Sequence, residues 1–304
     1  MRYTVDEVIT AVKRNAAIPT SQKKFSNSDF LAFMNEELQL TLVGELISQK
    51  EDYFIVTSNT ALAANTSEYD IPPTAIGWKL DAVGYVNDAG DYTPLAKVTR
   101  SQRGMYQRLL DSSAPTAYYV QGNKVILVPN AGATVDGSLQ FDYVRLQSEL
   151  VLTASCGLIS SVSTSGDNYL IDVNQVPNLA SGIDVISGTN PFNLIAEAAS
   201  ATSGATTITA AQSDFERAPV IGDFVAATGQ TCIPFIPEDY HPALAQAVAI
   251  RCLASSNDAG AIRTQMAVLQ NMFNVIRNRS KIRVNAGPQK IVSRSRIINL
   301  MRGR

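Results

Sequence analysis

The stretch Ala117–Pro129, AYYVQGNKVILVP, decides the fold because it predicts two strands joined by a tight turn. Tyr118–Gln121 and Lys124–Val128 are rich in the aromatic and β-branched residues that favour strands. Between them, Gly122-Asn123 supplies the positive φ angles that a two-residue hairpin turn requires. The sequence therefore predicts a β-hairpin in the middle of the chain.

Further strands are predicted on both sides of this hairpin, so that residues 53–152 form a β-rich region. The sequence SLQFDYVRL alternates apolar and polar residues, as a strand with one buried face does. Leu139, Phe141 and Tyr143 fall on one face of that strand, and Arg145 continues the series. Other strand candidates upstream are YFIVT, YDIPP, WKLDAVGYV and YTPL.

Residues 153–232 differ from the rest of the chain in composition and predict an inserted β module. The segment contains seven acidic residues, Arg217 as its only base, and no lysine. Short apolar runs alternate with turn residues in GLISSVS, NYLIDV, FNLIAEAA, TTITAA and GDFVAAT. A flexible linker would contain fewer β-branched and aromatic residues, so we expect compact strands here.

The two ends of the chain have helical patterns. Thr4 and Glu7 form a capping box, and apolar residues then recur at helical spacing. A second start signal at Ser26 precedes an apolar stripe that extends to about Gln49. Helical spacing returns after Pro237, where acidic residues occupy the first turn.

The last predicted helix carries apolar residues at alternating steps of four and three, which suits packing on another helix. These positions are Ile262, Met266, Leu269, Phe273 and Ile276. Neither pair of helices can bury its stripe alone, so residues 1–52 and 237–284 are expected to form one bundle. The predicted class is α+β, with a β-strand excursion, the inserted module and an extended tail, residues 285–304.

Composition places the chain among globular proteins. Apolar residues make up 45% of its 304 residues, which is enough to bury a core. No apolar run reaches about 18 residues, and acids stand where a secretory signal needs an apolar segment, so neither a membrane span nor secretion is expected. Cys156, Cys232 and Cys252 are an odd number at wide spacing, which favours reduced thiols. A Cys156–Cys232 disulfide is the alternative.

Charge is unevenly distributed along the chain. No acidic residue follows Asp258, whereas Arg263 and nine further basic residues do. Residues 1–258 therefore hold 25 − 10 = 15 basic residues against all 27 acidic ones, a net charge of −12. This polarity predicts an acidic partner for the tail, such as DNA, an acidic protein surface or anionic lipid. A solvated, disordered end is the alternative.

The residue pattern offers little for catalysis. His241 is the only histidine and precedes Pro242 at a helix start, so we expect a surface or capping role rather than a general base. Phosphate-binding and nucleophile motifs are missing, and the cysteines lack metal-ligand spacing. Glu36 and Glu37 point about 100° apart on a helix and predict a solvated face. Four aspartates of the insert match no calcium loop: Asp167, Asp172, Asp184 and Asp223. No catalytic residue, cofactor or metal is expected.

Five stretches spanning roughly residues 3–270 carry a resemblance to a known family. They are FSNSDFLAFMNEELQLTLVGELI, YDIPPTAIGWKLDAV, YTPLAKVTRSQ, PTAYYVQGNKVILVPNAGATVDGSLQFDYVRLQSEL and VIGDFVAATGQTCIPFIPEDYHPALAQAVAIRCLA. In texture and order they resemble the head-to-tail adaptor proteins of tailed bacteriophages, also called connectors or tail accessory factors. The acidic insert is larger than that of some family members.

The resemblance implies a structural, non-enzymatic virion protein at the head–tail junction, assembled in the cytoplasm of the host bacterium. Members of the family form rings, commonly of twelve subunits, between portal and tail. The expected partners are the portal protein, copies of the chain itself, tail or nozzle proteins, and the packaged DNA that passes through the channel. No membrane and no cofactor is expected.

The family's C-terminal segments often run extended onto the portal, which suits the basic tail of this chain. Gly287-Pro288 separates the tail from the preceding helix, and apolar residues lie between its basic ones. We expect the tail to be unfolded in the free protein and ordered on the portal, with DNA as the second choice of partner. The expected portal-binding residues are Lys290, Ile291, Val292, Arg294, Arg296, Ile297, Ile298, Leu300, Arg302 and Arg304.

Two other functions stay open at this point. A cell-wall-degrading glycoside hydrolase of a phage tail needs only two carboxylates, for which Glu36, Glu37 or acids of the insert are candidates. A DNA-binding protein would use the basic tail to contact phosphates.

Overall fold

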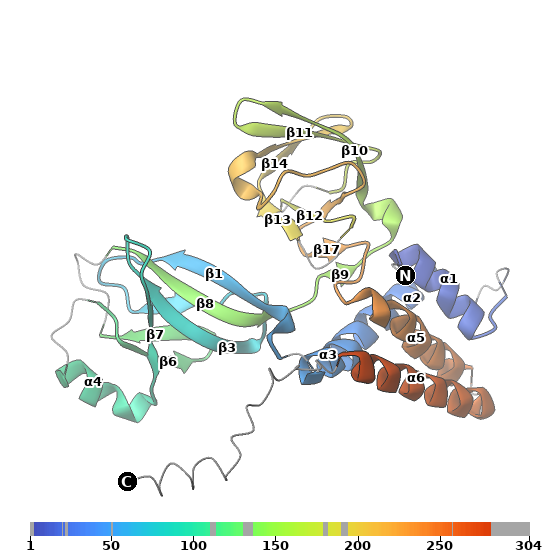
Figure 1. Ribbon diagram of the computed structural model, residues 1–304, viewed down its shortest axis with the longest axis horizontal. Helices are drawn as coiled ribbons and strands as arrows, with labels where there is room; N and C mark the ends of the chain where they lie inside the picture. The colour runs from blue at the N-terminus through green and yellow to red at the C-terminus, as the bar shows by residue number, and fades with distance from the viewer. Residues whose placement is uncertain are drawn as a thin grey trace, which may run out of the picture.

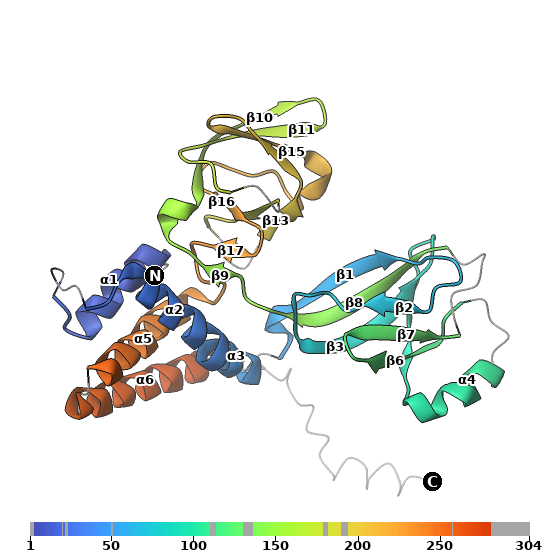
Figure 2. The ribbon, with the colours of Figure 1, turned by 180° about the vertical axis from the view of Figure 1, so that it is seen from behind.

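The computed structural model describes residues 3–19, 21, 24–49, 51–109, 114–129, 136–178, 182–189, 194–256 and 258–280. These residues form three lobes: a helical bundle, a β region and a rounded module of strands (Figure 1). The α+β class predicted from the sequence is confirmed. The short strand β9, Glu149–Leu150, lies where the three lobes meet (Figure 2).

The helical bundle is built from both ends of the chain. Its helices are α1 Val5–Asn15, α2 Asn27–Glu37, α3 Val43–Gln49, α5 His241–Ser255 and α6 Ala259–Ser280, and a π-helical turn, Leu38–Leu42, joins α2 to α3. The predicted starts of the first two helices are confirmed, because Thr4 with Glu7 and Ser26 with Asp29 form capping boxes. After Pro237 the predicted acidic first turn is a 3-10 turn, Glu238–Tyr240, and α5 begins only at His241.

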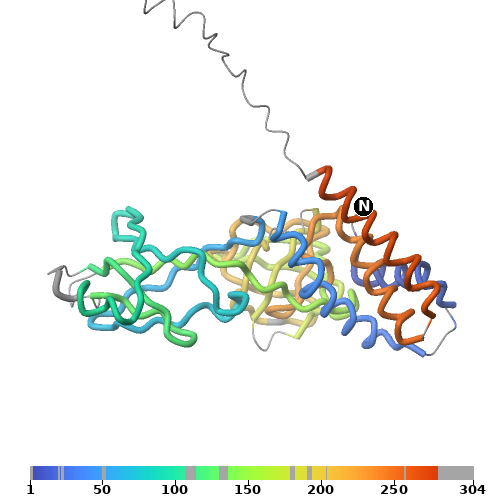
Figure 3. The backbone as a smooth tube through the Cα atoms, turned by 90° about the horizontal axis from the view of Figure 1, so that it is seen from below, coloured from blue at the N-terminus to red at the C-terminus, as the bar shows by residue number. Residues whose placement is uncertain are grey.

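One hydrophobic core unites these helices. Val8 of α1, Phe30 of α2 and Leu244 of α5 are all fully buried in it. Figure 3 shows the helices from the two ends of the chain gathered in one lobe, where α1 and α6 both lie next to α5. In α6, Ile262, Leu269, Phe273 and Ile276 pack against this core as the heptad predicts, whereas Met266 is exposed.

The β region has two four-stranded sheets, ordered β1-β8-β3-β4 and β2-β7-β6-β5. The strands are β1 Ile55–Ala61, β2 Glu68–Asp70, β3 Ala75–Val86, β4 Tyr92–Pro94, β5 Ala96–Lys97, β6 Ala117–Gln121, β7 Lys124–Val128 and β8 Ser138–Arg145. Side chains from both sheets share one core. The short helix α4, Arg103–Leu109, contributes Tyr106 to a second cluster on the other face of β6 and β7.

The hairpin predicted within residues 117–129 is confirmed. Gln121 lies opposite Lys124, and Gly122 has a φ angle of +64°. The alternation of β8 is confirmed too, because Leu139, Phe141 and Tyr143 are buried. The strand predicted at YFIVT begins later than expected. Its first two residues belong to a 3-10 turn, Glu51–Phe54, which links α3 to β1.

The inserted module holds a seven-stranded sheet ordered β13-β12-β16-β10-β11-β15-β14. Its strands are β10 Gly157–Ser165, β11 Asn168–Val173, β12 Ile183–Ile186, β13 Leu194–Ala199, β14 Ala201–Ser203, β15 Thr207–Ala211 and β16 Phe224–Ala227. Only Ser200 separates the two edge strands, β13 and β14. In a flat sheet these edges would be about 29 Å apart, or six strand spacings, so the sheet must curl upon itself.

The sequence did not predict β12. All four of its residues are buried, so it lacks the alternation of a half-exposed strand, and the charged Asp184 interrupts its apolar run. The backbone NH groups of Ala198 and Gly229 donate hydrogen bonds of 2.8 and 2.9 Å to the Asp184 carboxylate. These bonds explain how an acid is tolerated in the core.

The two ends of the module lie next to each other. β9 pairs in parallel with β17, Gln230–Thr231. Beyond β17, the carbonyl oxygen of Cys232 accepts a 2.9 Å hydrogen bond from the backbone NH of Val5, at the start of α1. The chain therefore enters and leaves the module at one place, next to the start of α1.

The cysteines are free, buried thiols, as the wide spacing predicted. The alternative disulfide between Cys156 and Cys232 is not formed. Burial raises the pKa of the Cys252 thiol to about 11, which disfavours the reactive thiolate.

Candidate functional site

The ten residues predicted to bind the portal, Lys290 to Arg304, lie outside the described residues. The described residues that precede the tail end with α6, at Ser280. Near the end of α6, Arg277 donates hydrogen bonds of 2.5 and 2.6 Å to the two carboxylate oxygens of Glu45 on α3. This contact lowers the pKa of Glu45 and fixes the last turn of α6 against α3.

The predicted carboxylate pair forms an ion-pair network instead of an open acid–base site. Arg251 of α5 binds Glu37 through Nε and Glu36 through Nη1. The expectation of a merely solvated face was wrong for Glu37, whose side chain is 13% exposed. Because a guanidinium bridges both carboxylates, this pair joins α2 to α5 and does not have the two free acids that glycoside hydrolysis needs.

The surface position expected for His241 was wrong, because the side chain is fully buried. Its Nδ1 accepts a 2.9 Å hydrogen bond from the backbone NH of Tyr3, so Nε2 carries the proton and faces the carbonyl oxygen of Ile236 at 3.1 Å. Burial lowers the pKa of the imidazole, which is therefore neutral. His241 ties the N-terminal segment to the start of α5.

Three of the insert's aspartates have structural partners. Asp172 accepts hydrogen bonds from the hydroxyls of Ser161 and Thr207, both at 2.6 Å. Asp184 is held by backbone NH groups, and Asp223 lies in a network described below. Within the described ranges, no group of three or more His, Cys, Asp or Glu side chains is arranged to hold a metal ion. No helix among the same residues is long and apolar enough to cross a membrane.

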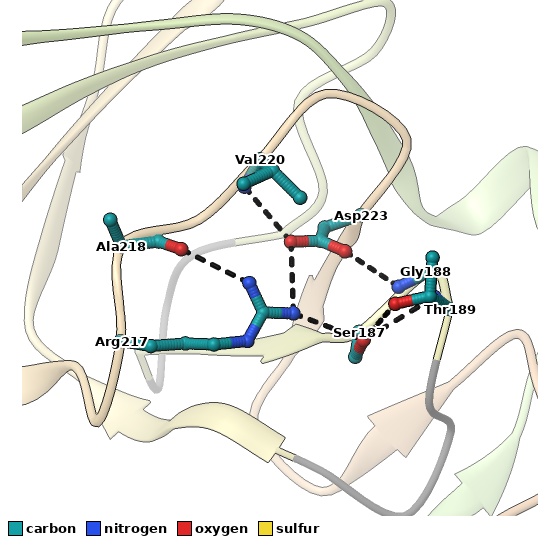
Figure 4. A network of polar contacts seen from close by, with 7 residues as sticks. All are labelled: Ser187, Gly188, Thr189, Arg217, Ala218, Val220 and Asp223. Atoms are coloured by element: carbon teal, nitrogen blue, oxygen red, sulfur yellow. Dashed lines mark hydrogen bonds and ion pairs between the residues drawn. The ribbon is translucent and has the colours of Figure 1, made fainter.

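A buried polar network braces one loop of the module (Figure 4). Asp223 is 1% exposed and accepts hydrogen bonds from the backbone NH groups of Gly188, at 2.6 Å, and Val220, at 2.9 Å. Arg217 contacts the same carboxylate at 3.5 Å and donates a 3.0 Å hydrogen bond to Ser187. A β-carbon at Gly188 would collide with the carbonyl oxygen of Gly222, so this close approach requires glycine.

The braced loop presents apolar side chains to solvent. Val220 is 47% exposed and Ile221 is 72% exposed, although the loop's backbone is held by Asp223. A rigid loop that exposes two aliphatic residues is a candidate contact surface. No local sequence pattern marks this loop, because the network joins residues that are about thirty positions apart.

A second surface lies along the bundle, between α6 and the start of α5. It is a groove of about 280 Å³, whose lining includes Pro242, Val268, Met272 and Val275. Val268 and Val275 are 38% and 42% exposed. The heptad pattern did not predict this second apolar face of α6.

The fold described above can be compared with known proteins. A profile of the SU10 adaptor proteins matches residues 3–177, more than half of the chain. The chain belongs to the SU10 adaptor protein family. This membership confirms the resemblance to phage head-to-tail adaptors. The matched range covers α1 to α3, the β region and the first two strands of the module, whereas α5, α6 and the tail follow it.

A search of the curated proteins found no match to the chain. Family membership nevertheless identifies this SU10-type adaptor as a structural bacteriophage protein of the virion, which interacts with other virion components. Adaptors of this kind are generally not enzymes.

Proposed function

We propose that this adaptor forms a ring between the portal and the tail of a bacteriophage, extends the DNA channel and docks tail or nozzle proteins. Membership of the SU10 adaptor family is the observation that carries the proposal. The ring is a dodecamer assembled on the portal in the host cytoplasm. Free subunits stay monomeric or weakly associated, because the body of the chain carries a net charge of −12 and repels its copies.

The tail attaches the adaptor to the portal. Its basic residues suit acidic walls of a protein groove, and its isoleucines supply apolar anchors that a phosphate-only binder would not need. The Arg277–Glu45 contact supports this role, because it fixes the point from which the tail departs. DNA binding by the tail is the second candidate, since its charges would also favour a passing duplex.

The exposed apolar surfaces supply the remaining contacts. In a ring, the groove beside α6 meets a neighbouring copy. We assign the Val220–Ile221 loop to tail or nozzle proteins, because the Asp223 network holds it rigid and it lies on a lobe distinct from the bundle. The module itself, residues 153–232, is proposed to fold as a unit on the outside of the ring.

Sedimentation of the purified chain with and without portal protein tests the proposal. We expect a slow-sedimenting species alone and a complex of about twelve added subunits on the portal. A stable dimer that is indifferent to the portal would contradict it.

Two double variants separate the modes of tail binding. Ile297→Ser with Ile298→Ser keeps every charge, and Arg294→Gln with Arg296→Gln keeps every apolar anchor. We expect both to weaken attachment. If only the arginine variant fails, the tail is an electrostatic clamp and the anchor argument is wrong.

A further inference from the structure

A cleft between the β region and the inserted module has the chemistry of a binding site for basic side chains. Its outer cavity measures about 530 Å³ and is lined by β1 and β8 on one side and by β13 and the 3-10 turn Gln212–Asp214, which follows β15, on the other. An inner chamber of about 70 Å³ continues from it, because both are lined by Val56, Arg145 and Leu194.

The outer cavity has more negative than positive charge. Glu197, Asp214 and Glu216 line it, whereas Arg145 is its only basic residue. Arg145 Nη2 lies 2.9 Å from Glu197 Oε1, so one carboxylate is paired and two are left for another cation. Asp184, which is buried, and Glu216 both act electrostatically on Glu197. These two charges add to the negative potential of this wall.

The inner chamber contains a buried acceptor that has no hydrogen bond. Gln147 is 6% exposed, lines the chamber, and its Oε1 atom has no partner among the described residues. Leaving a buried acceptor unpaired is costly, so the site favours a ligand that donates a hydrogen bond there. Phe54, Leu194 and Phe235 give the rest of the chamber an apolar lining. An arginine or lysine side chain fits all of this, with an apolar stem and a donating cationic head.

We propose that this cleft holds the basic C-terminal segment of the same chain, residues 281–304, while the subunit is free. The segment carries seven basic residues and no acid, so its charge complements the cleft. The segment follows the Arg277–Glu45 contact on α3, and the turn after α3 supplies Phe54 to the inner chamber. Its 24 residues span up to about 80 Å when extended, and its covalent attachment raises its effective concentration at the cleft.

This contact between the tail and the cleft is proposed in addition to the attachment of the tail to the portal, and it does not depend on that attachment. In the free subunit the cleft occupies the charged side chains of the tail. Such a contact screens the tail from DNA and other polyanions until a tighter partner removes it.

Carbodiimide cross-linking of the full-length chain at low salt locates the tail directly, since it joins lysines only to carboxylates in contact. We expect mass spectrometry of the monomer-sized product to find Lys281 or Lys290 joined to Glu197, Asp214 or Glu216. The link should be lost at about 1 M salt, where screening is nearly complete. Links found only in a dimer-sized product would assign the cleft to a second copy, and no link to these acids would reject the site; either result overturns the proposal.

A variant supplies the independent readout. In Glu197→Gln with Asp214→Asn and Glu216→Gln, trypsin should cleave after Arg283 and Lys290 on the order of tenfold faster, since cleavage follows the released population. The control, Asp88→Asn with Asp91→Asn, removes exposed acids from the turn between β3 and β4 and should leave the rate unchanged. Equal rates in wild type and the triple variant would also reject the proposal, provided that both have the same helical signal by circular dichroism.

Discussion

In the helical bundle the core joins residues from opposite ends of the chain, whereas the main core cluster of the inserted module comes from residues 159–225. Val8 and Leu244, both fully buried, meet in the first. Ile171 and Val185, equally buried, meet in the second. The comparison shows that the module is stabilised by contacts within one continuous segment, while the bundle forms only when the chain ends come together.

The two lobes also hold their charges differently. The bundle places its ion pairs at the surface, where Arg251 and Arg277 join helices from the two ends of the chain. The module instead buries Asp184 and Asp223 and satisfies them mainly with backbone NH groups. Loss of a buried acid should therefore cost more than loss of a surface pair.

Core truncations should have the largest effect on stability, and each should destabilise only the lobe that contains it. Leu244→Ala in the bundle and Ile171→Ala in the module each remove a fully buried side chain, at about 2–5 kcal/mol. We expect Leu244→Ala to lower the transition seen by helical circular dichroism and Ile171→Ala to leave that transition in place. If both variants move one common calorimetric transition equally, the lobes unfold together and the comparison fails.

Asp223→Ala tests the buried network of the module. It leaves the NH groups of Gly188 and Val220 without an acceptor, at about 1–3 kcal/mol each. Urea unfolding should show a lower free energy of unfolding for the module. Asp223→Asn, which keeps one acceptor oxygen, should lower it less than Asp223→Ala does. Full stability of the alanine variant would mean that the network does not brace the loop.

Acid should act on the lobes in opposite directions. Burial raises the pKa of Asp184 and of Glu197, so the folded module binds protons more tightly than the unfolded chain does. The module therefore gains stability as pH falls from 7 toward the ordinary pKa range of carboxylates, near about 4. The hydrogen bond from Arg277 lowers the pKa of Glu45, so the bundle loses that contribution only as pH falls below this range.

Calorimetry between pH 7 and 4.5 or so checks this difference. We expect the module's melting temperature to rise by several degrees, since about 1 kcal/mol moves a small domain by about 4–8 °C. Glu197→Gln should reduce the rise. The module's Asp172 has a lowered pKa and opposes the trend only at still lower pH. Parallel shifts of both transitions would show that Asp184 and Glu197 do not govern the pH dependence of the module.

Arg277→Gln should have the smallest effect. The Arg277 side chain is 43% exposed, so solvent screens its ion pair with Glu45 and the loss of that pair should lower stability only slightly. Arg263→Gln, an exposed position of the same helix, is the matched control. Thermal unfolding of both variants measures the difference, which should shrink as salt rises. A loss of several kcal/mol would show that the end of α6 is held mainly by this pair.

Local patterns in the sequence predicted much of the fold. The capping boxes, the Gly122-Asn123 turn and the alternation of β8 each act over a few residues, so the sequence displays them. Features that depend on distant partners were missed or misjudged. β12 shows no alternation because it is buried on both faces, and His241 is buried because a backbone NH from the other end of the chain reaches it.

The candidate surfaces were harder to predict than the fold. The basic tail is visible in the sequence because it is marked by its composition, and composition can be read without knowing which residues are in contact. The Arg145–Glu197 pair, the unpaired Gln147 oxygen and the Val220–Ile221 loop arise only where segments far apart in sequence converge. Packing alone creates such sites, so no local pattern marks them.

The central claim is that the tail of this adaptor attaches it to the portal, and one measurement addresses it directly. The full-length chain and a chain truncated after Asn285 are mixed with portal protein, and the mass of each complex is determined by native mass spectrometry. Matching circular dichroism spectra establish that the truncated body is folded. The account predicts a ring of adaptor subunits on the portal for the full-length chain and unoccupied portal for the truncated one. A portal complex of the same stoichiometry with the truncated chain would contradict it.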